Sequence, residues 1–225
     1  MKKILVLLFL LTLSLHAQVG FMDQAKNATL GVMEAIKAHP FLLEIANGTL
    51  SKSRFDYYSK QDKIYDWRYA NSLLGLARKA PRVDLKKFLI TAANDTTAYW
   101  EGPPPLISKQ CKDCSGYSDF EEVSVDRSFA QGLASIAPCY VVYWTIGNWL
   151  KQISVPNNPY QEWIEGNSSP HYGTHVMELE NFINEIASNV TKAEESEMLE
   201  TYLRSTEYEW YFWNSAYKES TWEQK

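Results

Sequence analysis

The chain has 225 residues and a formal net charge of −5, and these values limit its class. This length fits one well-packed domain rather than several. The acidic balance, and the lack of a basic patch beside exposed aromatic residues, argue against nucleic acid as a partner. Eight Trp and 14 Tyr are many for this length. They favour an interior space lined by aromatic rings over a plain aliphatic core.

The first residues have the layout of a secretory signal peptide. Two lysines precede an apolar run at residues 4–15, and Ala17 is a small residue suited to cleavage. This run is shorter than the roughly 20 residues that a membrane-spanning helix needs. We therefore expect a signal peptide at 1–17 and a single all-α domain at 18–225. The mature protein would be secreted or lie in the secretory lumen (the periplasm in a bacterium), without a membrane attachment. The alternative is an uncleaved anchor.

Glycosylation sequons and cysteines bear on the same prediction. The sequence Asn-X-Ser/Thr without an intervening Pro begins at Asn27, Asn47, Asn94, Asn167 and Asn189. These asparagines would carry glycans only in a eukaryotic secretory route. Cys111 and Cys114 are close enough in the chain for a small disulfide in an oxidising compartment, which leaves Cys139 unpaired. As zinc ligands, one such pair without a partner pair is a weak signal.

Helical periodicity dominates the chain, and no run alternates as a strand would. Proline, glycine and serine punctuate the predicted helices. We expect helices at 21–39, 41–46, 53–80, 83–100, 117–125, 128–153 and 160–165, one that ends near 187, and a last one at 192–217, with a loop at 106–116. Because most connections are short, neighbouring helices should be antiparallel and form a bundle.

Two carboxylates fall on apolar stripes of these helices. Asp62 lies within a stripe of Phe55, Tyr58, Tyr65, Tyr69, Leu73 and Leu76. Glu209 shares a side of the last helix with Tyr202, Thr206, Phe212 and Ala216. A carboxylate that faces the core must find a partner or lose its charge. Asp62 is then either a structural acid or a group that orients a ligand, and Glu209 either a solvated acid or an acid–base catalyst with a raised pKa.

Cys139 occupies the corresponding position in the helix at 128–153. It shares a stripe with Phe129, Leu133, Ile136, Tyr143 and Gly147. Pro138 precedes it, so we expect a bend beside the thiol and a free backbone carbonyl near Ala134. A buried cysteine is commonly just a small apolar residue. To act as a nucleophile, Cys139 would need a lowered pKa and a nearby acid or base.

Five short segments follow one another in an order and spacing that together are specific. They are His39-Pro40-Phe41 through Gly48-Thr49-Leu50; Phe55 to Tyr65 with Gln61-Asp62; Ala137-Pro138-Cys139-Tyr140 through Gly147; Asn158-Pro159-Tyr160 with Trp163-Ile164; and Glu209-Trp210-Tyr211-Phe212-Trp213. With these segments the chain resembles the TenA/thiaminase II family along nearly all of its mature length.

The resemblance implies an all-α bundle of the haem-oxygenase-like type, a homotetramer, and no metal or organic cofactor. It implies hydrolysis of thiamine-derived aminopyrimidines, a step of thiamine salvage, with thiamine cleavage as a related activity. Cys139 would be the nucleophile, Glu209 the acid–base catalyst, and Asp62 the group that bonds the aminopyrimidine ring. Tyr65, Tyr117 and Tyr143 would line the substrate-binding pocket, with Phe212 as a packing wall, and Tyr117 is the loosest match.

Two positions depart from the family pattern and concern substrate choice. Thr145 stands where the family commonly has Glu, and Asn167 stands where it usually has a pocket Tyr. A glycan on Asn167 is incompatible with a closed pocket. Either that loop faces outward, or Asn167 is unmodified and the pocket has a different shape.

Two other classes of function compete with the hydrolase. The first is a secreted, non-catalytic protein that binds pyrimidine or thiamine, which Thr145 and Asn167 favour and Cys139 with Glu209 disfavours. The second is a metalloprotein, because His171, His175 and Glu178 are spaced along one helical face. We expect that segment to be only the start of a surface helix. Haem is disfavoured because Pro40 ends the helix of His39.

Overall fold

The computed structural model describes residues 19–220, which form an all-α bundle. The predicted signal peptide at 1–17 lies outside the described residues. The helices are α1 (Phe21–Ala28), α2 (Leu30–Lys37), α3 (Pro40–Ala46), α4 (Lys52–Lys79), α5 (Val83–Ala98), α6 (Lys112–Arg127), α7 (Phe129–Ile153), α8 (Gln161–Asn167), α9 (Pro170–Ser188) and α10 (Lys192–Lys218), with a 3-10 turn at Ile107–Lys109. The all-α prediction is confirmed.

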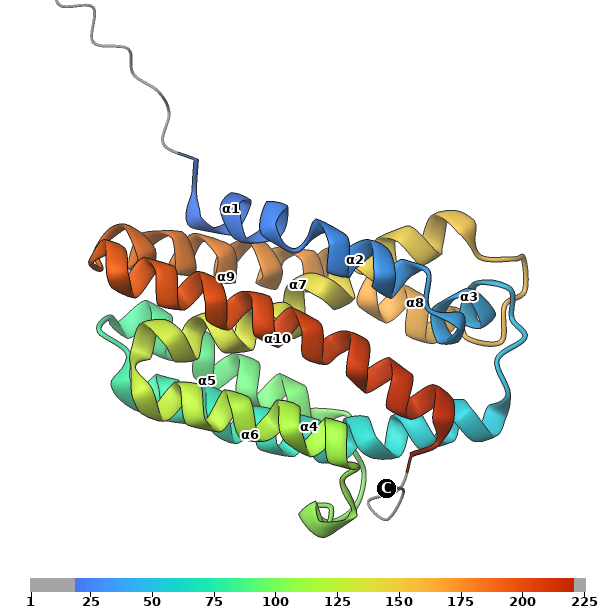
Figure 1. Ribbon diagram of the computed structural model, residues 1–225. Coiled ribbons are helices and arrows are strands. Elements are labelled where there is room, and N and C mark those ends of the chain that lie inside the picture. The colour runs from blue at the N-terminus through green and yellow to red at the C-terminus, as the bar shows by residue number, and fades with distance from the viewer. Residues whose placement is uncertain (1–18, 221–225) are drawn as a thin grey trace, which may run out of the picture.

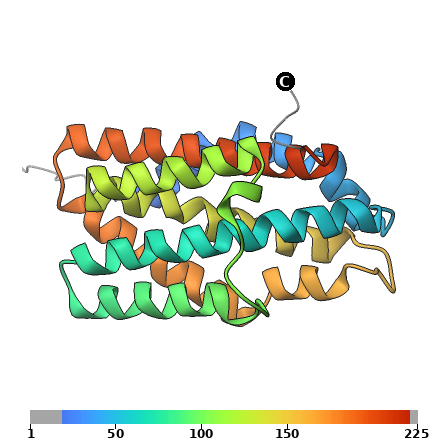
Figure 2. The ribbon, with the colours of Figure 1, turned by 90° about the horizontal axis from the view of Figure 1, so that it is seen from below.

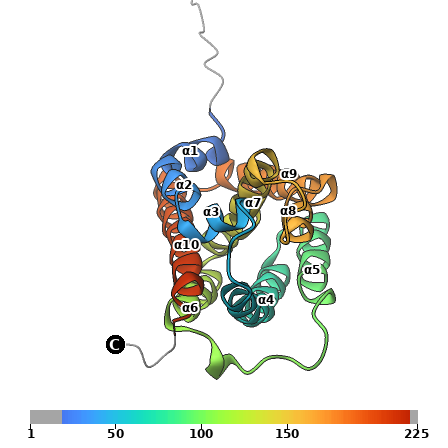
Figure 3. The same cartoon turned by 90° about the vertical axis from the view of Figure 1, so that its right-hand side faces the viewer.

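Helix α7 is the centre of the bundle. It packs against α10, α6, α8, α9, α4 and α3, and the end-on view in Figure 3 shows these helices grouped around it. The long helices run along a common axis (Figure 1, Figure 2). Helices α1 and α2 lie over α9 and α10 on one side, and α5 packs mainly on α4. Within residues 19–220, no helix is both long and apolar enough to cross a membrane.

Side-chain caps explain where most of the helices begin. The hydroxyls of Ser51, Ser128 and Thr191 accept backbone N–H groups of the first turns of α4, α7 and α10. The helix predicted at 53–80 therefore begins one residue earlier, at Lys52, with Ser51 as its cap. The loop predicted at 106–116 is also too long, because α6 begins at Lys112. Its cap is the Cys111 sulfur, which accepts the Cys114 N–H, and sulfur is not among the usual capping atoms.

The helix predicted at 21–39 is two helices, α1 and α2, that meet at Thr29. The Thr29 hydroxyl donates to the backbone carbonyls of Ala25 and Lys26. A threonine that bonds back to the preceding turn competes with helix continuation. A single threonine is a weak sequence signal for the end of a helix, so the apolar periodicity alone did not reveal the break.

The three predicted stripes face the interior. On α4, Tyr58, Tyr65, Tyr69, Leu73 and Leu76 are buried, and on α10 the predicted face, including Glu209, is at most 2% exposed. In α7, Pro138 has no N–H to donate to the Ala134 carbonyl. The two carbonyls that follow accept side chains of other helices: Ser205 donates to the Ser135 carbonyl and Tyr69 to the Ile136 carbonyl. These bonds tie α7 to α10 and α4.

Two glycines allow α8 and α9 to approach α7 closely. A Cβ at Gly147 would lie 2.6 Å from the backbone carbonyl carbon and oxygen of Asn167. A Cβ at Gly173 would lie 2.5 Å from Trp144. These positions fix the helices that form one wall of the site described below.

We predict that Gly147→Ala destabilises the protein, because the methyl group meets backbone that cannot rotate away. The free energy of unfolding should fall by about 1–3 kcal/mol, as for other overpacked interiors. The matched control is Gly31→Ala in α2, where no atom lies within 4 Å of the added Cβ. That change should raise stability by roughly 0.5–1 kcal/mol. Urea unfolding followed by circular dichroism measures both, and equal stabilities for the two variants would contradict the packing argument.

Candidate active site

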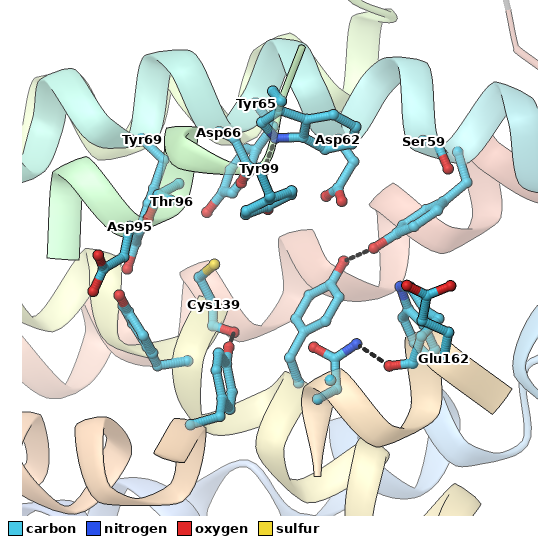
Figure 4. Close-up of a pocket in the computed structure, with 18 of the residues that line it drawn as sticks. Ser59, Asp62, Tyr65, Asp66, Tyr69, Asp95, Thr96, Tyr99, Cys139 and Glu162 are labelled. Atoms are coloured by element: carbon cyan, nitrogen blue, oxygen red, sulfur yellow. Dashed lines mark hydrogen bonds between the residues drawn. The ribbon is translucent and has the colours of Figure 1, made fainter. Parts of the chain in front are cut away.

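A pocket of about 660 Å³ opens between α4, α5, α7, α8 and α9. Figure 4 shows its interior, with the Cys139 sulfur directed into it from α7 and a row of acidic and phenolic side chains facing it from α4. The aromatic lining expected from the composition is present. It comprises Phe55, Tyr58, Tyr65, Tyr69, Tyr99, Trp100, Tyr140, Tyr143, Tyr160, Trp163 and Tyr172.

The structure brings the sequence-predicted residues together in two layers. Asp62, Tyr65, Cys139 and Tyr143 line the pocket itself. The second layer lies directly behind the first. Phe212 packs against Tyr65 and Tyr58. Tyr117 packs against Tyr65 with ring centroids 5.0 Å apart. Both Tyr117 and Phe212 are almost completely buried and are not among the residues that line the pocket. Phe212 is thus a packing wall, as expected, whereas Tyr117 lies behind Tyr65 rather than in the lining.

Glu209 belongs to the buried layer and is 1% exposed, so it is not a solvated helix acid. Its Oε1 accepts a hydrogen bond from the Tyr117 hydroxyl at 2.8 Å. Burial raises the pKa of Glu209 to about 8, and the bond from Tyr117 partly opposes this rise. At neutral pH the carboxyl is therefore mostly protonated and can donate a proton.

A second acid, Asp66, lies one helical turn beyond Asp62 in the same wall. Its Oδ2 accepts from the Tyr99 hydroxyl at 2.5 Å and the Trp100 Nε1 at 2.6 Å. Burial raises the pKa of Asp66 to about 7 despite these two bonds. Burial, and then the neighbouring Asp66, also raise the pKa of Asp62 well above its ordinary range. Because two like charges this close oppose each other, the pair holds a proton near neutral pH.

Asp66 was missed by the sequence analysis, although a signal existed. Its spacing of four residues from Asp62 places both on one helical face. Glu121 of α6 was also missed, and it is fully buried. The Tyr65 hydroxyl donates to its Oε1 at 2.7 Å, and its Oε2 has no protein partner among the described residues. Burial raises the pKa of Glu121 well above the usual value.

The thiol of Cys139 differs from the sequence-based requirement of a lowered pKa. Burial raises its pKa, and the carboxyls of Glu209, Glu121 and Asp66 raise it further, while contact with the Tyr65 hydroxyl opposes them. A thiolate next to several acids is unfavourable. The resting site therefore holds a neutral thiol, and any nucleophilic step has to couple sulfur attack to transfer of the thiol proton.

Charge in this pocket has a single sign. Among residues 19–220, no Lys or Arg lines the pocket, whereas Asp62, Asp66, Asp95 and Glu162 do. The one buried guanidinium near this wall, Arg68, points away from it and binds Glu122 and Asp119 of α6. Low-dielectric walls of one sign concentrate ligands of the opposite charge. A cationic or hydrogen-bond-donating ligand thus fits this pocket, and an anionic one does not.

The two departures from the family pattern differ in consequence. Thr145 lies outside the pocket lining, and its hydroxyl donates to the Val141 carbonyl of its own helix. Asn167 does line the pocket, and its side-chain amide donates to the Trp163 carbonyl at 2.9 Å. Of the two alternatives for the Asn167 loop, an inward-facing residue is the one observed. The other four sequon asparagines are exposed.

Cys111 and Cys114 are joined by a disulfide at the start of α6. The Gln61 amide secures this loop, because its Oε1 accepts the Cys111 N–H at 2.7 Å and its Nε2 donates to the Lys109 carbonyl at 3.1 Å. Gln61, the first residue of the Gln61-Asp62 pair, therefore has a structural role. Its neighbour Asp62 faces the pocket.

The histidines of α9 do not combine with Glu178. His171 and His175 instead face Asp95 of α5, and one potential ligand atom of each lies within 4.8 Å of the others. All three line the mouth of the pocket. Sequence spacing could pair the histidines with Glu178 but could not bring in Asp95.

Comparison with known proteins agrees with this architecture. The TENA/THI-4/PQQC family model matches residues 108–219. A solved TenA homologue from Pyrococcus furiosus superimposes with a TM-score of 0.79 at 20% identity, covering 87% of this chain and 99% of that chain. The chain has the TenA fold. The sequence is also 26% identical to an aminopyrimidine aminohydrolase of Bacillus subtilis over 224 residues, covering 90% of this chain and 92% of the relative.

A second relative of the same name is also similar along most of its length. The aminopyrimidine aminohydrolase of Halalkalibacterium halodurans is 26% identical over 212 residues and covers 85% of this chain and 92% of its own length. The sequence similarity to these two relatives thus extends over most of the chain and is not limited to the helix that contains Cys139.

The raised acid pKa values predict how stability depends on pH. Folding raises the pKa of Glu209 from 4.5 to about 8 and that of Asp66 from 3.8 to about 7. The folded state then holds more protons than the unfolded state between about pH 4 and 8, so the free energy of unfolding falls as pH rises through this window. Glu209→Gln should make the fall shallower by up to about 1.4 kcal/mol per pH unit.

Urea unfolding at several pH values between these limits measures the slope for the wild type, Glu209→Gln, Asp66→Asn and the double variant. Identical slopes in all four proteins would contradict the raised pKa values. A slope reduced in each single variant, and more so in the double variant, is the expected result.

Proposed function

We propose that the protein hydrolyses thiamine-derived aminopyrimidines, converting 4-amino-5-aminomethyl-2-methylpyrimidine to the hydroxymethyl compound, with thiamine cleavage as a related activity. The observation that carries the proposal is that Cys139 and Asp62 face one aromatic pocket whose described lining has no Lys or Arg, with the Glu209 carboxyl buried behind it and close enough to raise the pKa of the thiol. The names of the relatives from Bacillus subtilis and Halalkalibacterium halodurans support the substrate class.

The charge of the pocket supports an amine-bearing ligand. An aminomethyl group is a cation at neutral pH, and the thiazolium ring of thiamine is cationic as well. Either would meet the carboxyls of Asp62 and Asp66 on α4. The flat pyrimidine ring matches the aromatic walls, in which Tyr143 and Trp163 pack edge to face with ring centroids 6.1 Å apart. Neutralising the acids with a cation would also lower the cost of negative charge on sulfur.

In the proposed mechanism the Cys139 sulfur adds to a ring carbon adjacent to the substituted one. The thiol proton passes to a ring nitrogen, which Asp62 holds by hydrogen bonding, so no free thiolate is needed in the resting site. The ring has then lost its aromaticity and can expel the amine from the exocyclic carbon. This route is consistent with the raised pKa of the thiol.

Glu209 carries the second proton in this mechanism. The substrate amine and the Glu209 carboxyl share one proton. The pair is either an ammonium with a carboxylate or a neutral amine with a protonated acid, and both states hold the same number of protons. The amine leaves as ammonia with that proton. Water then adds to the exocyclic carbon and gives a proton to the Glu209 carboxylate. Departure of sulfur, with return of its proton, restores the aromatic ring and the resting site.

We also propose that the protein is exported and assembles as a homotetramer. Export is supported by the disulfide between Cys111 and Cys114, since such bonds persist in oxidising compartments. It is further supported by the exposed sequon asparagines, Asn27, Asn47, Asn94 and Asn189. The tetramer rests on the family resemblance alone.

We predict that Cys139→Ser folds normally and loses turnover, because serine keeps the shape of the side chain but is a far weaker nucleophile. Ammonia release from the aminomethyl pyrimidine by purified protein measures this. The rate should fall by at least about 100-fold, the scale at which a single catalytic group contributes. Thr145→Ser, on the same helix but outside the pocket, should keep the wild-type rate.

The possible outcomes separate the hydrolase from a binding protein. Unchanged turnover in Cys139→Ser would rule out the nucleophile. No ammonia release by the wild type, with the compound still raising its thermal stability, would instead indicate a non-catalytic pyrimidine-binding protein whose site Asn167 has altered.

We further predict that the pocket prefers the amine to the alcohol. In the Cys139→Ser background, where turnover is absent, the aminomethyl pyrimidine should bind about 10-fold more tightly than the hydroxymethyl compound, or about 1.4 kcal/mol. Asp66→Asn should reduce this preference, because the ammonium then loses one nearby carboxyl. Isothermal titration calorimetry at neutral pH compares the four combinations, and equal affinities in all of them would refute the charge argument.

A further inference from the structure

We propose that Asp95, His171 and His175 form a binding site for a divalent transition-metal ion of the Zn²⁺ class at the mouth of the pocket. The three side chains come from α5 and α9, and a potential ligand atom of each lies within 4.8 Å of the others. This site is separate from the chemistry proposed for Cys139, and its existence does not depend on that reaction.

The proposed site lies at one end of the interface between α5 and α9, which run antiparallel. At the other end of this interface, Arg82 pairs with Glu185. Further along, the rings of Phe88 and Phe182 pack with centroids 5.5 Å apart. Asp95, about two helical turns beyond Phe88 on α5, faces His171 and His175 of α9 where the pocket opens.

At the pocket end of the α5–α9 interface, the side chains of Asp95, His171 and His175 stand where apolar and ion-pair contacts join the helices elsewhere. A bound cation would join the two helices beside the opening. It would thus extend to the mouth of the pocket the contact between α5 and α9 that Phe88 and Phe182 make farther along the two helices.

The two histidines have the spacing that metal sites on helices use. Residues four apart lie on one helical face, as in paired histidine ligands of zinc enzymes. The rings of His171 and His175 have centroids 4.5 Å apart. Phe88 packs against His175 at 6.1 Å and limits the orientations of that ring. Ligand atoms of a tetrahedral zinc site are roughly 3.3 Å apart for Zn–N bonds of about 2.0 Å, a separation reached by small side-chain rotations.

The donor set selects the class of ion. Two imidazoles and one carboxylate suit Zn²⁺ and its first-row neighbours, whereas Mg²⁺ and Ca²⁺ prefer oxygen ligands. Three protein ligands leave a tetrahedral ion one further position, for water or for a donor atom of a ligand in the pocket. The ion would also add positive charge at the pocket mouth, beside the carboxyl of Asp95.

The third described histidine does not compete for the ion. His39 is 4% exposed, and its Nδ1 accepts the Phe41 N–H at 3.2 Å as the cap of α3. Zinc titration of the full chain, produced in a bacterial host that leaves Asn94 unmodified and freed of metal with a chelator, tests the site by calorimetry. We expect saturable binding of one Zn²⁺ per chain.

Variants then identify the ligands. His171→Ala/His175→Ala should lower the zinc affinity by more than the about 10–100-fold that loss of an outer-shell partner alone causes, and Asp95→Asn should lower it as well. Glu178→Gln, the matched control on α9, should bind as the wild type does. Cys139→Ser should also retain binding, so failure of the hydrolase proposal leaves this one standing.

Two results would overturn the proposal. One is the absence of saturable zinc binding by the wild type. The other is unchanged affinity in the double histidine variant, which would assign the zinc to a different group, such as Cys139 or His16. Because the three ligands lie at the surface, the variants should melt at the wild-type temperature without zinc. Added Zn²⁺ should raise the melting temperature of the wild type but not of the double variant.

Discussion

Buried carboxyl groups impose the main constraint on this bundle, because each one loses its hydration and needs hydrogen-bond donors within the interior. The protein does so largely with aromatic donors. Tyr65 donates to Glu121, Tyr117 donates to Glu209, and Tyr99 and Trp100 donate to Asp66. The tyrosine-rich composition thus has a specific physical purpose: phenols add apolar area to the core and supply the hydrogen bonds that buried acids need. These bonds cross between helices and hold the walls of the pocket in place.

The same arrangement determines the chemical state of the site. Buried acids that are bonded by neutral phenols, rather than by guanidinium or ammonium groups, keep their protons to a higher pH. Proton-holding carboxyls around Cys139 make a store of protons beside a neutral thiol. This state suits a reaction in which each bond to carbon forms or breaks together with movement of a proton. It is ill suited to a nucleophile that depends on being ionised beforehand.

The long helices could be predicted from the sequence, because their apolar faces repeat over many turns. The inward position of Asp62, Cys139 and Glu209 followed from those faces. The start of α6 could not be predicted, since its cap is a cysteine in a loop that contains proline and glycine. The resemblance implied that Tyr117 lines the pocket, but it lies one layer behind, packed on Tyr65, because a matched motif does not give the depth of a side chain behind its neighbours.

Contacts between distant segments were beyond the reach of sequence spacing. Asp95 meets His171 and His175 only because α5 and α9 run side by side, and Tyr99 meets Asp66 only because α5 folds back on α4. The resemblance to a known family supplied the roles of the residues that match its motifs. It was silent about Asp66 and Glu121, which no motif contains.

The glycines of α7 and α9 have a consequence for the rate at which molecules enter and leave. Gly147 and Gly173 let the α8–α9 wall pack against α7 without a gap. We therefore expect widening of the mouth to come from α5, which ends at Ala98 and continues as a loop. Exchange of ligand with solvent then depends on how fast that end of α5 moves. Since Tyr99 also bonds Asp66, each opening of the mouth would expose one of the acids of the site to water.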